Sequence, residues 1–173
     1  MNRIPVTDIS PVIFFGSQFR PVKAIPGERI TVSATVFREG HDALGADVVL
    51  FNSEGKEVAR SIMREIWHGG DRFKAEIFIP SRGDFTYAIE SYDNPLATWF
   101  HDAEIKIAAD VDAELMCTIG AALFEEVIGV DPSAKSLLKS AIAALRDTKL
   151  APLNRFGQAS TKEIRAYCEA HPL

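Results

Sequence analysis

Two histidine–aspartate pairs are the residues of this chain whose types and spacing could support chemistry. His41-Asp42 ends the polar run REGHD, residues 38–42, and His101-Asp102 lies within ATWFHDAEIKI. Such pairs act as metal ligands in phosphohydrolases, where they have a helical setting and further histidine and aspartate ligands. The chain has four histidines, and both pairs flank or lie in predicted strands. We therefore predict no metal site and no cofactor.

The sequence supports nucleophilic catalysis, glycoside hydrolysis and phosphate binding no better than it supports a metal site. The sequence has no GxSxG elbow and no glycine-rich run leading from a strand into a helix. Cys117 and Cys168 are far apart in the sequence and form no CxxC motif, which indicates two small buried hydrophobic residues. The acids of the two polar segments would need a cleft to work as a carboxylate pair, and a sandwich offers none. We predict no catalytic residue within this chain.

The tryptophans have different settings. Trp67 lies in the loop sequence IWHGG, where it can stack on a sugar ring, contact a partner protein or pack within its own loop. Trp99 shares the alternating face of Ile105 and Ile107, so we expect a core or corner residue. Trp67 is the possible sugar contact of this chain.

Polar residues without a complete catalytic set can still order a loop or form a docking surface. Charge-assisted hydrogen bonds serve both purposes and require no turnover. The candidates for an interface or for loop ordering are Arg38, Glu39, His41, Asp42, Trp99, His101 and Asp102.

Composition narrows the class of protein. The 173 residues are 47% hydrophobic with a formal net charge of -5, which is enough apolar material for a core. No run of Lys and Arg is present to follow phosphates, so we expect no nucleic-acid partner. The start MNRIPVTDIS lacks the layout of a signal peptide, and no long apolar span follows it. We expect a cytoplasmic protein with no membrane partner.

Residues 1–108 show the alternating pattern of strands. Predicted strands cover 30–36, 46–51, 56–66, 73–80, 85–89 and 98–107, with edge segments at 12–15 and 21–25. A turn is expected at Asn52–Gly55. Short strands at this spacing, without helices between them, predict an immunoglobulin-like β-sandwich.

Residues 109–173 change to a helical period, which predicts three amphipathic helices. The first has Leu115, Ile119, Ala122/Leu123 and Val127 along one side. The second begins at Asp131-Pro132, and the third at the capping box formed by Ser160 and Glu163, with Lys149–Ala159 as a loop before it. Because three short helices have a marginal core, we expect a fragment of a longer protein.

Four segments follow one another in a recognisable order: ATVFREGHDALGADVVL, MREIWHGGDRFKAEI, GDFTYAIESYDNPLATWFHDAEIKI and DVDAELM. Together they resemble the N-terminal region of bacterial maltosyltransferases of the α-amylase superfamily, which use α-maltose 1-phosphate to lengthen α-1,4-glucans. The resemblance covers about residues 3 to 127 closely and is looser from Val130 onward. The family position matching Phe100 is often Arg, so the chain departs from the pattern there.

The resemblance implies a division of labour. In that family a sandwich with a helical insertion precedes a catalytic (β/α)₈ barrel, and the catalytic carboxylates belong to the barrel. The family's chain returns from the helices to the sandwich before it enters the barrel, so the resemblance implies that this sequence stops before that return. The sandwich and insertion are associated with a homodimer and with packing against the barrel. The expected partners are therefore the enzyme's own barrel and a second subunit, with α-glucan and maltose 1-phosphate as substrates of the full-length enzyme.

Three readings stay open at this point. The chain is either such an accessory and dimerisation region, a glycan-binding module that uses Trp67, or a stand-alone sandwich for protein interaction. Binding of maltooligosaccharides separates the second from the first, and the sequence downstream of Leu173 separates the third.

Overall fold

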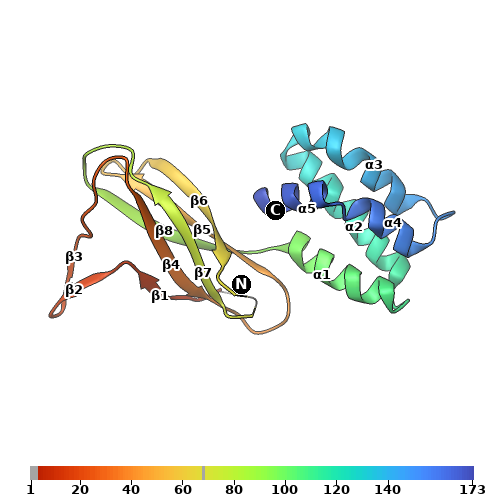
Figure 1. The fold of residues 1–173 in the computed structure, drawn as a ribbon, viewed down its shortest axis with the longest axis horizontal. Helices are drawn as coiled ribbons and strands as arrows, with labels where there is room; N and C mark the ends of the chain where they lie inside the picture. The colour runs from red at the N-terminus through yellow and green to blue at the C-terminus, as the bar shows by residue number, and fades with distance from the viewer. Residues whose placement is uncertain (1–3, 68) are drawn as a thin grey trace. The chain divides into compact units, whose positions relative to one another are not determined.

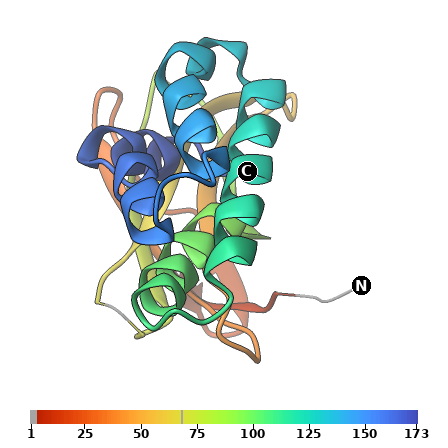
Figure 2. The same cartoon turned by 90° about the vertical axis from the view of Figure 1, so that its right-hand side faces the viewer.

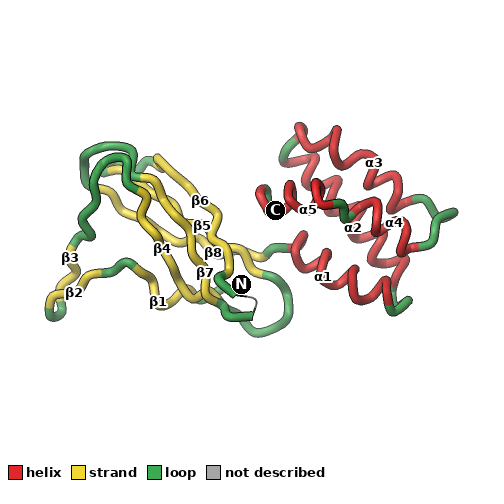
Figure 3. The backbone as a smooth tube through the Cα atoms, in the orientation of Figure 1, coloured by secondary structure: helices red, strands yellow, loops and turns green. Residues whose placement is uncertain are grey.

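The computed structural model describes residues 4–67 and 69–173, and the chain divides into two compact units. The β unit contains Met1–Gly40 and Leu44–Tyr92, and the helical unit contains His41–Ala43 and Asp93–Leu173. Strands lie in the first and helices in the second, as Figure 1 and the colouring of Figure 3 show. The chain is therefore β-rich with a helical extension, as the sequence predicted. The division falls at residue 93, whereas the sequence placed it after residue 108.

The β unit has eight strands within its described residues. They are β1 (Val6–Ser10), β2 (Ile13–Phe15), β3 (Gln18–Arg20), β4 (Arg29–Val36), β5 (Leu44–Asn52), β6 (Glu57–Glu65), β7 (Arg72–Phe78) and β8 (Phe85–Asp93). Six of them form one sheet in the order β1-β4-β7-β6-β5-β8, and β2 pairs only with β3. The pairings of β1 with β4, β4 with β7, β7 with β6 and β6 with β5 are antiparallel.

The core of the β unit follows from side chains that alternate along each strand. Val32 and Ala34 of β4 pair with Ala75 and Phe73 of β7, and these residues belong to one buried cluster with Val48 of β5. The turn between β5 and β6 lies where it was predicted, since the Oδ1 of Asn52 accepts from the N–H groups of residues 54 and 56.

Side chains of β8 bring the two ends of the sheet together. The Tyr87 hydroxyl donates to the carbonyl of Pro11 at 2.8 Å, and the Ser91 hydroxyl donates to that of Ile4 at 3.2 Å. The six strands thus form a nearly closed sheet around their core. The immunoglobulin-like arrangement of two separate sheets stays a prediction.

The helical unit contains five α-helices in the described residues, not three. They are α1 (Pro95–Ala108), α2 (Ala113–Val130), α3 (Lys135–Arg146), α4 (Pro152–Ala159) and α5 (Lys162–Ala170), with a 3₁₀ turn at Pro132–Ala134 before α3. Figure 2 shows the unit from the side, with α2 and α3 next to each other. Helix α4 occupies the segment that was predicted to be a loop.

The strand predicted at residues 98–107 is wrong, because this segment is helix α1. Asn94 caps the helix by accepting from the N–H of Ala97 at 3.0 Å, and Pro95 is in its first turn. Leu96, Trp99 and Ala103 are buried on one side of it. The sequence Asn94-Pro95 was interpreted as a break between strands, and it is a helix start.

Helix α2 exposes most of the apolar stripe that was predicted from the sequence. Leu115, Ile119 and Ala122 are exposed, and only Val127 of that set is fully buried. The buried side instead carries Ala113, Met116, Cys117, Gly120, Ala121 and Phe124. Small residues on this side allow the neighbouring helix to approach closely. Because Leu115 and Ile119 are apolar as well, helix α2 has two apolar sides and buries one of them.

The predicted helix starts are partly correct. Asp131 caps the turn that leads into α3, since its side chain accepts from the N–H of Ser133 at 3.0 Å. The capping box at Ser160 and Glu163 is wrong, because Thr161 caps α5 by accepting from Ile164 and Ser160 ends α4.

Candidate functional site

The loop that carries the first histidine–aspartate pair is held by its backbone. The N–H of Ala43 donates to the Oγ1 of Thr98 at 2.8 Å, and the N–H of Asn94 donates to the carbonyl of Ala43 at 2.9 Å. Because Thr98 lies in the first turn of α1, these bonds fix the loop to the start of that helix. The side chains of His41 and Asp42 are exposed beside this connection.

Arg38 and Glu39, the first residues of the REGHD run, lie just before this loop. Arg38 is half-buried, and Glu39 is exposed at the end of the β unit. The run therefore spans the point where the chain passes from the β unit into the helical unit. Its order comes from backbone bonds at residue 43, so loop ordering by the charged side chains themselves stays a prediction.

The second histidine–aspartate pair lies on α1, one turn beyond Thr98. His101 is exposed, and the Oδ2 of Asp102 accepts from the ammonium of Lys106 at 3.0 Å, one turn later on the same helix. A half-exposed pair of this kind adds a few tenths of a kcal/mol to a helix. Both pairs are thus associated with α1, but on its exposed side.

Trp99 is a core residue, as predicted, although it reaches the core from a helix. Its indole N–H donates to the carbonyl of Met116 at 2.8 Å, and its ring packs edge-on against Phe124 and Phe156. Phe100 lies in the same aromatic cluster, with the guanidinium of Arg165 over its ring at 4.8 Å. An aromatic cluster this deep stabilises the helical unit and is closed to a ligand.

Trp67 is an exposed aromatic candidate. Its side chain is 59% exposed in the loop between β6 and β7. The carboxylate of Glu65 orders this loop by accepting from the N–H groups of Gly70 and Asp71 at 3.0 and 3.2 Å. His68 lies outside the described residues.

The two cysteines are buried and form no disulfide, as predicted. Burial raises the pKa of the Cys117 thiol, and it raises the pKa of Cys168 to about 11. Both thiols are therefore neutral at physiological pH and do not act as nucleophiles.

Sequence reasoning missed a polar cluster on β5, β6 and β8. The buried carboxylate of Asp47 accepts from the guanidinium of Arg60 and from the Tyr92 hydroxyl, each at 3.0 Å. Arg60 also pairs with Glu57 and Glu90. The hydrogen bonds that Arg60 donates to Glu57, Glu90 and Asp47 raise the pKa of Arg60, so the cluster stays charged and joins three strands.

A second missed pair connects α4 to α2. The side chain of Arg155 is 3% exposed, and its two terminal nitrogens donate to both oxygens of Glu114 at 2.6 and 2.8 Å. These hydrogen bonds lower the pKa of Glu114. No short-range pattern announces this pair, because its partners are far apart in sequence.

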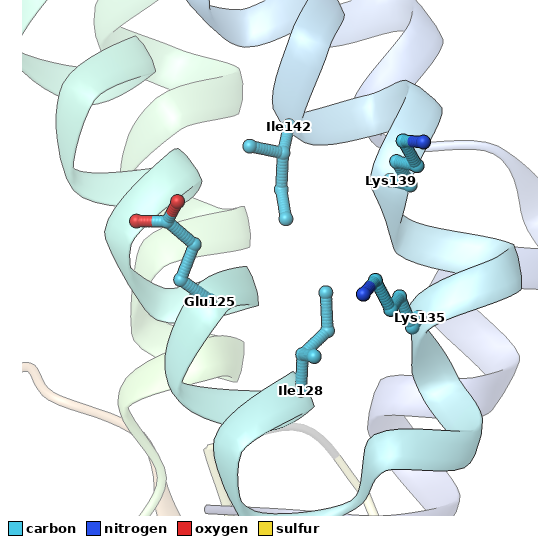
Figure 4. Close-up of a pocket in the computed structure, with 5 residues that line it drawn as sticks. All are labelled: Glu125, Ile128, Lys135, Lys139 and Ile142. Carbon is cyan, nitrogen blue, oxygen red and sulfur yellow. The ribbon is translucent and has the colours of Figure 1, made fainter.

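Helices α2 and α3 enclose an open groove of about 340 Å³. Figure 4 shows its apolar floor, Ile128 and Ile142, and two lysines of α3 one turn apart, Lys135 and Lys139. Glu125 on the opposite wall is held by Arg146 at 2.7 Å. The groove offers charge and apolar contact, and it brings no nucleophile together with a base.

A metal site and a membrane-spanning helix are both absent from the residues that the structure describes. Residues 4–67 and 69–173 contain no group of three or more His, Cys, Asp or Glu side chains placed to hold a metal ion. None of the helices in these ranges has the length and apolar character needed to cross a bilayer.

Comparison with known proteins identifies the family of this chain. A family model described as alpha-1,4-glucan:maltose-1-phosphate maltosyltransferase, domain N/S, matches residues 2–173. The chain belongs to this family. The resemblance seen in the sequence motifs is thereby confirmed, and it extends through the helical unit as well.

Individual relatives agree. Maltosyltransferases 2 and 1 of Streptomyces coelicolor, each named alpha-1,4-glucan:maltose-1-phosphate maltosyltransferase, are 41% identical to this chain over 175 residues, which is 100% of this chain and 26% of each relative. The Mycobacterium tuberculosis enzyme of the same name is 30% identical over 198 residues, 99% of this chain and 28% of the relative. The chain spans about a quarter of the length of these curated relatives.

Proposed function

We propose that this chain is the non-catalytic N-terminal region of an enzyme that transfers maltosyl units from α-maltose 1-phosphate to α-1,4-glucans. In this proposal the chain supplies contact area for a second subunit and for the enzyme's own catalytic barrel. The bond-making residues lie in the rest of the polypeptide. The names of the relatives and the small share of their length that this chain matches support the assignment.

The exposed apolar side of α2 carries the contact role. Leu115 and Ile119 lie one turn apart on this side and are 52% and 37% exposed. A surface helix of a monomer normally has one apolar side, which faces its core. A helix with a second apolar side is typical of a protein that packs against another surface.

The position of the REGHD run, residues 38–42, supports the same role. The run lies at the passage between the two units, and backbone bonds fix its end to α1. Exposed charges on an ordered segment suit a docking surface, where they set orientation and exclude wrong partners.

A transfer assay and a measurement of mass test the proposal together. The purified 173-residue chain and the full-length enzyme are each given α-maltose 1-phosphate and a short α-1,4-glucan. We expect transfer by the full-length enzyme only, and a concentration-dependent dimer of the isolated chain in sedimentation experiments. Transfer by the isolated chain would contradict the non-catalytic role.

Glycan binding by Trp67 is the second candidate function, because its indole is accessible at the tip of an ordered loop. Stacking of a sugar ring on this indole would change tryptophan fluorescence, whereas Trp99 is buried and insensitive. A titration with maltooligosaccharides up to millimolar concentration measures this change. No change, or the same change in a Trp67→Ala variant, excludes binding at this residue.

Two finer assignments belong to the proposal. An immunoglobulin-like arrangement of the β unit is supported by its single core cluster, to which β4, β5, β6 and β7 all contribute. A cytoplasmic location is supported by the two buried, unpaired cysteines.

A further inference from the structure

The outer side of the six-stranded sheet carries cations and hydroxyls where β4 and β7 pair. These strands are neighbours in the sheet of Figure 1, with Thr35 directly opposite Arg72 and Ser33 directly opposite Lys74. Phe73, which lies between the two cations on β7, is buried in the core of the β unit. Because side chains alternate along a strand, the four polar residues share the opposite side of the sheet. This set of four residues is called here the β4–β7 cluster.

Arg72 is held in place by neutral oxygens alone. Its Nη2 donates to the Oγ of Ser33 at 2.7 Å, and its Nη1 donates to the Oγ1 of Thr35 at 3.2 Å and to the carbonyl of Asp8 at 2.7 Å. Within the described residues no carboxylate forms an ion pair with this half-buried guanidinium. Its positive charge is therefore oriented but not neutralised, and an anion placed against it would gain charge-assisted hydrogen bonds.

The β4–β7 cluster has more donors than acceptors. A guanidinium has five N–H groups, and the three bonds of Arg72 leave two of them, the Nε–H included, without an acceptor in the described part of the chain. The hydroxyl oxygens of Ser33 and Thr35 accept from Arg72, so their own O–H groups remain to donate. Lys74 is exposed and forms no ion pair within residues 4–67 and 69–173. Such a set of donors suits an anion with several oxygen atoms.

The neighbouring strand adds a further cation. Arg64 of β6 lies directly opposite Lys74 in the antiparallel pairing. Like charges opposite each other on one side of a sheet cost free energy, and an anion bound between them would reduce this cost. Two carboxylates limit the extent of the cluster. Glu76 is two residues beyond Lys74 on the same side of β7, and the Asp8 carboxylate at the other end accepts from the Thr7 hydroxyl at 3.3 Å.

The spacing of a β-sheet matches the size of a phosphate group. Side chains two residues apart on one strand are about 7 Å apart, and neighbouring strands are about 4.8 Å apart. The long side chains of Arg72 and Lys74 can therefore contact one small ion that lies over the hydroxyls of β4. A tetrahedral phosphate accepts from a guanidinium, an ammonium and a hydroxyl at the same time, whereas the two oxygens of a carboxylate are satisfied by the guanidinium alone.

We propose that the β4–β7 cluster is a binding site for a phosphate group. The two remaining N–H groups of Arg72 bind phosphate oxygens, the Lys74 ammonium supplies the second positive charge, and the hydroxyls of Ser33 and Thr35 donate from the sheet. The same chemical group occurs in free inorganic phosphate and in a sugar phosphate ester. The site belongs to the β unit and is independent of the contact role in the proposed function.

Nuclear magnetic resonance of the nitrogen-15-labelled chain tests the site. Inorganic phosphate is titrated at neutral pH against sodium chloride of equal ionic strength, and the arginine Nε–H signals are followed together with the backbone amides. We expect saturable shifts at the Arg72 Nε–H and at the amides of Ser33, Thr35 and Lys74, with a dissociation constant in the roughly millimolar range. Chloride and acetate should produce no saturable shift at these positions.

Two variants show whether the named donors are responsible. Arg72→Lys keeps the positive charge but removes the planar fork, and Lys74→Gln removes an exposed ammonium. We expect each change to weaken phosphate binding roughly tenfold or more. Lys56→Gln is the matched control, because Lys56 is also an exposed lysine of the β unit but lies in the turn after β5. Circular dichroism verifies folding, and the exposed position of Lys74 keeps the test decisive if Arg72→Lys does not fold.

A hexose 1-phosphate in the same titration distinguishes the two sources of the phosphate group. Equal or weaker binding of the ester identifies inorganic phosphate as the ligand. Tighter binding of the ester, with a shift of the Trp67 indole N–H, identifies a sugar phosphate, because Trp67 directly follows Ile66, whose N–H donates to the carbonyl of Arg72.

Three results would overturn the proposal. They are the absence of a saturable shift with both ligands, saturable shifts only at positions outside the β4–β7 cluster, and equal phosphate affinity in the native chain and in Lys74→Gln. None of these results bears on the non-catalytic role, which the transfer assay decides separately.

Discussion

The indole of Trp99 lies directly against the backbone of Gly120. A Cβ atom at position 120 would come within 2.1 Å of the ring, closer than any van der Waals contact allows. The indole N–H meanwhile donates to the carbonyl of Met116, one turn earlier on the same helix. The absence of a side chain at Gly120 thus sets how closely α1 approaches α2.

Gly120→Ala is expected to destabilise the chain although alanine favours helices. Displacing a tryptophan that is fixed by three phenylalanines costs about 1–3 kcal/mol in an overpacked core. Alanine in place of glycine returns about 1 kcal/mol at most in a helix. Urea unfolding monitored by circular dichroism measures the difference.

Gly129→Ala is the matched control on the same helix. A Cβ at Gly129 meets nothing within 4 Å, so only the helix preference acts, and we expect unchanged or slightly raised stability. Equal destabilisation by both substitutions would show that the Trp99 contact is not the cause.

The three tyrosines are expected to resist ionisation. Burial raises the pKa values of Tyr87 and Tyr92, and burial with the bond to Asp131 raises that of Tyr167 to about 12. The stability that depends on the protonated phenols is complete below about pH 10 and is lost as pH rises through the raised pKa values.

Phenolate absorbance measures this directly. At a pH slightly above about 10 the native chain should show much less phenolate than the same chain in urea, where tyrosines titrate normally. Tyr167→Phe should remove the part that titrates near pH 12. Coincident titration curves for native and unfolded protein would contradict the expectation.

Glu114→Gln should lower the melting temperature at neutral pH. The Glu114 carboxylate receives two hydrogen bonds from Arg155, and its pKa is lowered by them. A group with a lowered folded pKa contributes stability above its unfolded pKa and loses it as pH falls through the folded value. The difference between native chain and variant should therefore close below about pH 4. Glu126→Gln, on the same helix but without an ion pair, should match the native chain throughout.

Thr98→Val should loosen the loop of the first histidine–aspartate pair. Valine keeps the shape and leaves the Ala43 N–H without its acceptor, which costs about 1–2 kcal/mol. Faster hydrogen exchange at Ala43 reports the change, and Thr98→Ser should behave like the native chain. His41→Ala should affect exchange less, since its side chain is exposed.

The same loop also bears on the full-length enzyme. His41→Ala with Asp42→Ala is expected there to disturb dimer assembly or stability more than turnover. An intact dimer and melting temperature with abolished turnover would contradict a docking role for these residues.

The β unit was largely predictable because its signal is local. Strands alternate with a period of two, and Asn52 and Gly55 mark the turn between β5 and β6 through their own chemistry. The loop position of Trp67 and the burial of Trp99 were also predicted correctly, although Trp99 lies on a helix and not on the predicted strand.

Residues 98–107 show where a period misleads. Trp99, His101, Ala103, Ile105 and Ile107 alternate like a strand, yet Leu96, Trp99, Phe100, Ala103 and Ile107 also follow a helical period. The decisive signal was the cap at Asn94 followed by Pro95, which favours the first turn of a helix. Caps and periods must therefore be weighed together.

Contacts across long sequence distances were beyond reach. The side of α2 that becomes buried depends on the Trp99 indole meeting Gly120, and Arg155 is buried because Glu114 of another helix receives it. In a helix that is apolar on two sides, the sequence pattern does not specify which side faces the core. The Asp47–Arg60–Tyr92 cluster likewise joins strands whose order no local pattern specifies.

The formal charge is divided unequally, since the helical unit has 13 acidic and 8 basic side chains and the β unit has 11 of each. This division matters when the two units are separated. A polypeptide limited to the β unit would be close to its isoelectric point at neutral pH. It would still expose three phenylalanines of β2 and β3: Phe14, Phe15 and Phe19. Charge repulsion between molecules would then be too weak to prevent aggregation. In the joined chain, the net negative charge of the helical unit supplies the repulsion that the β unit lacks.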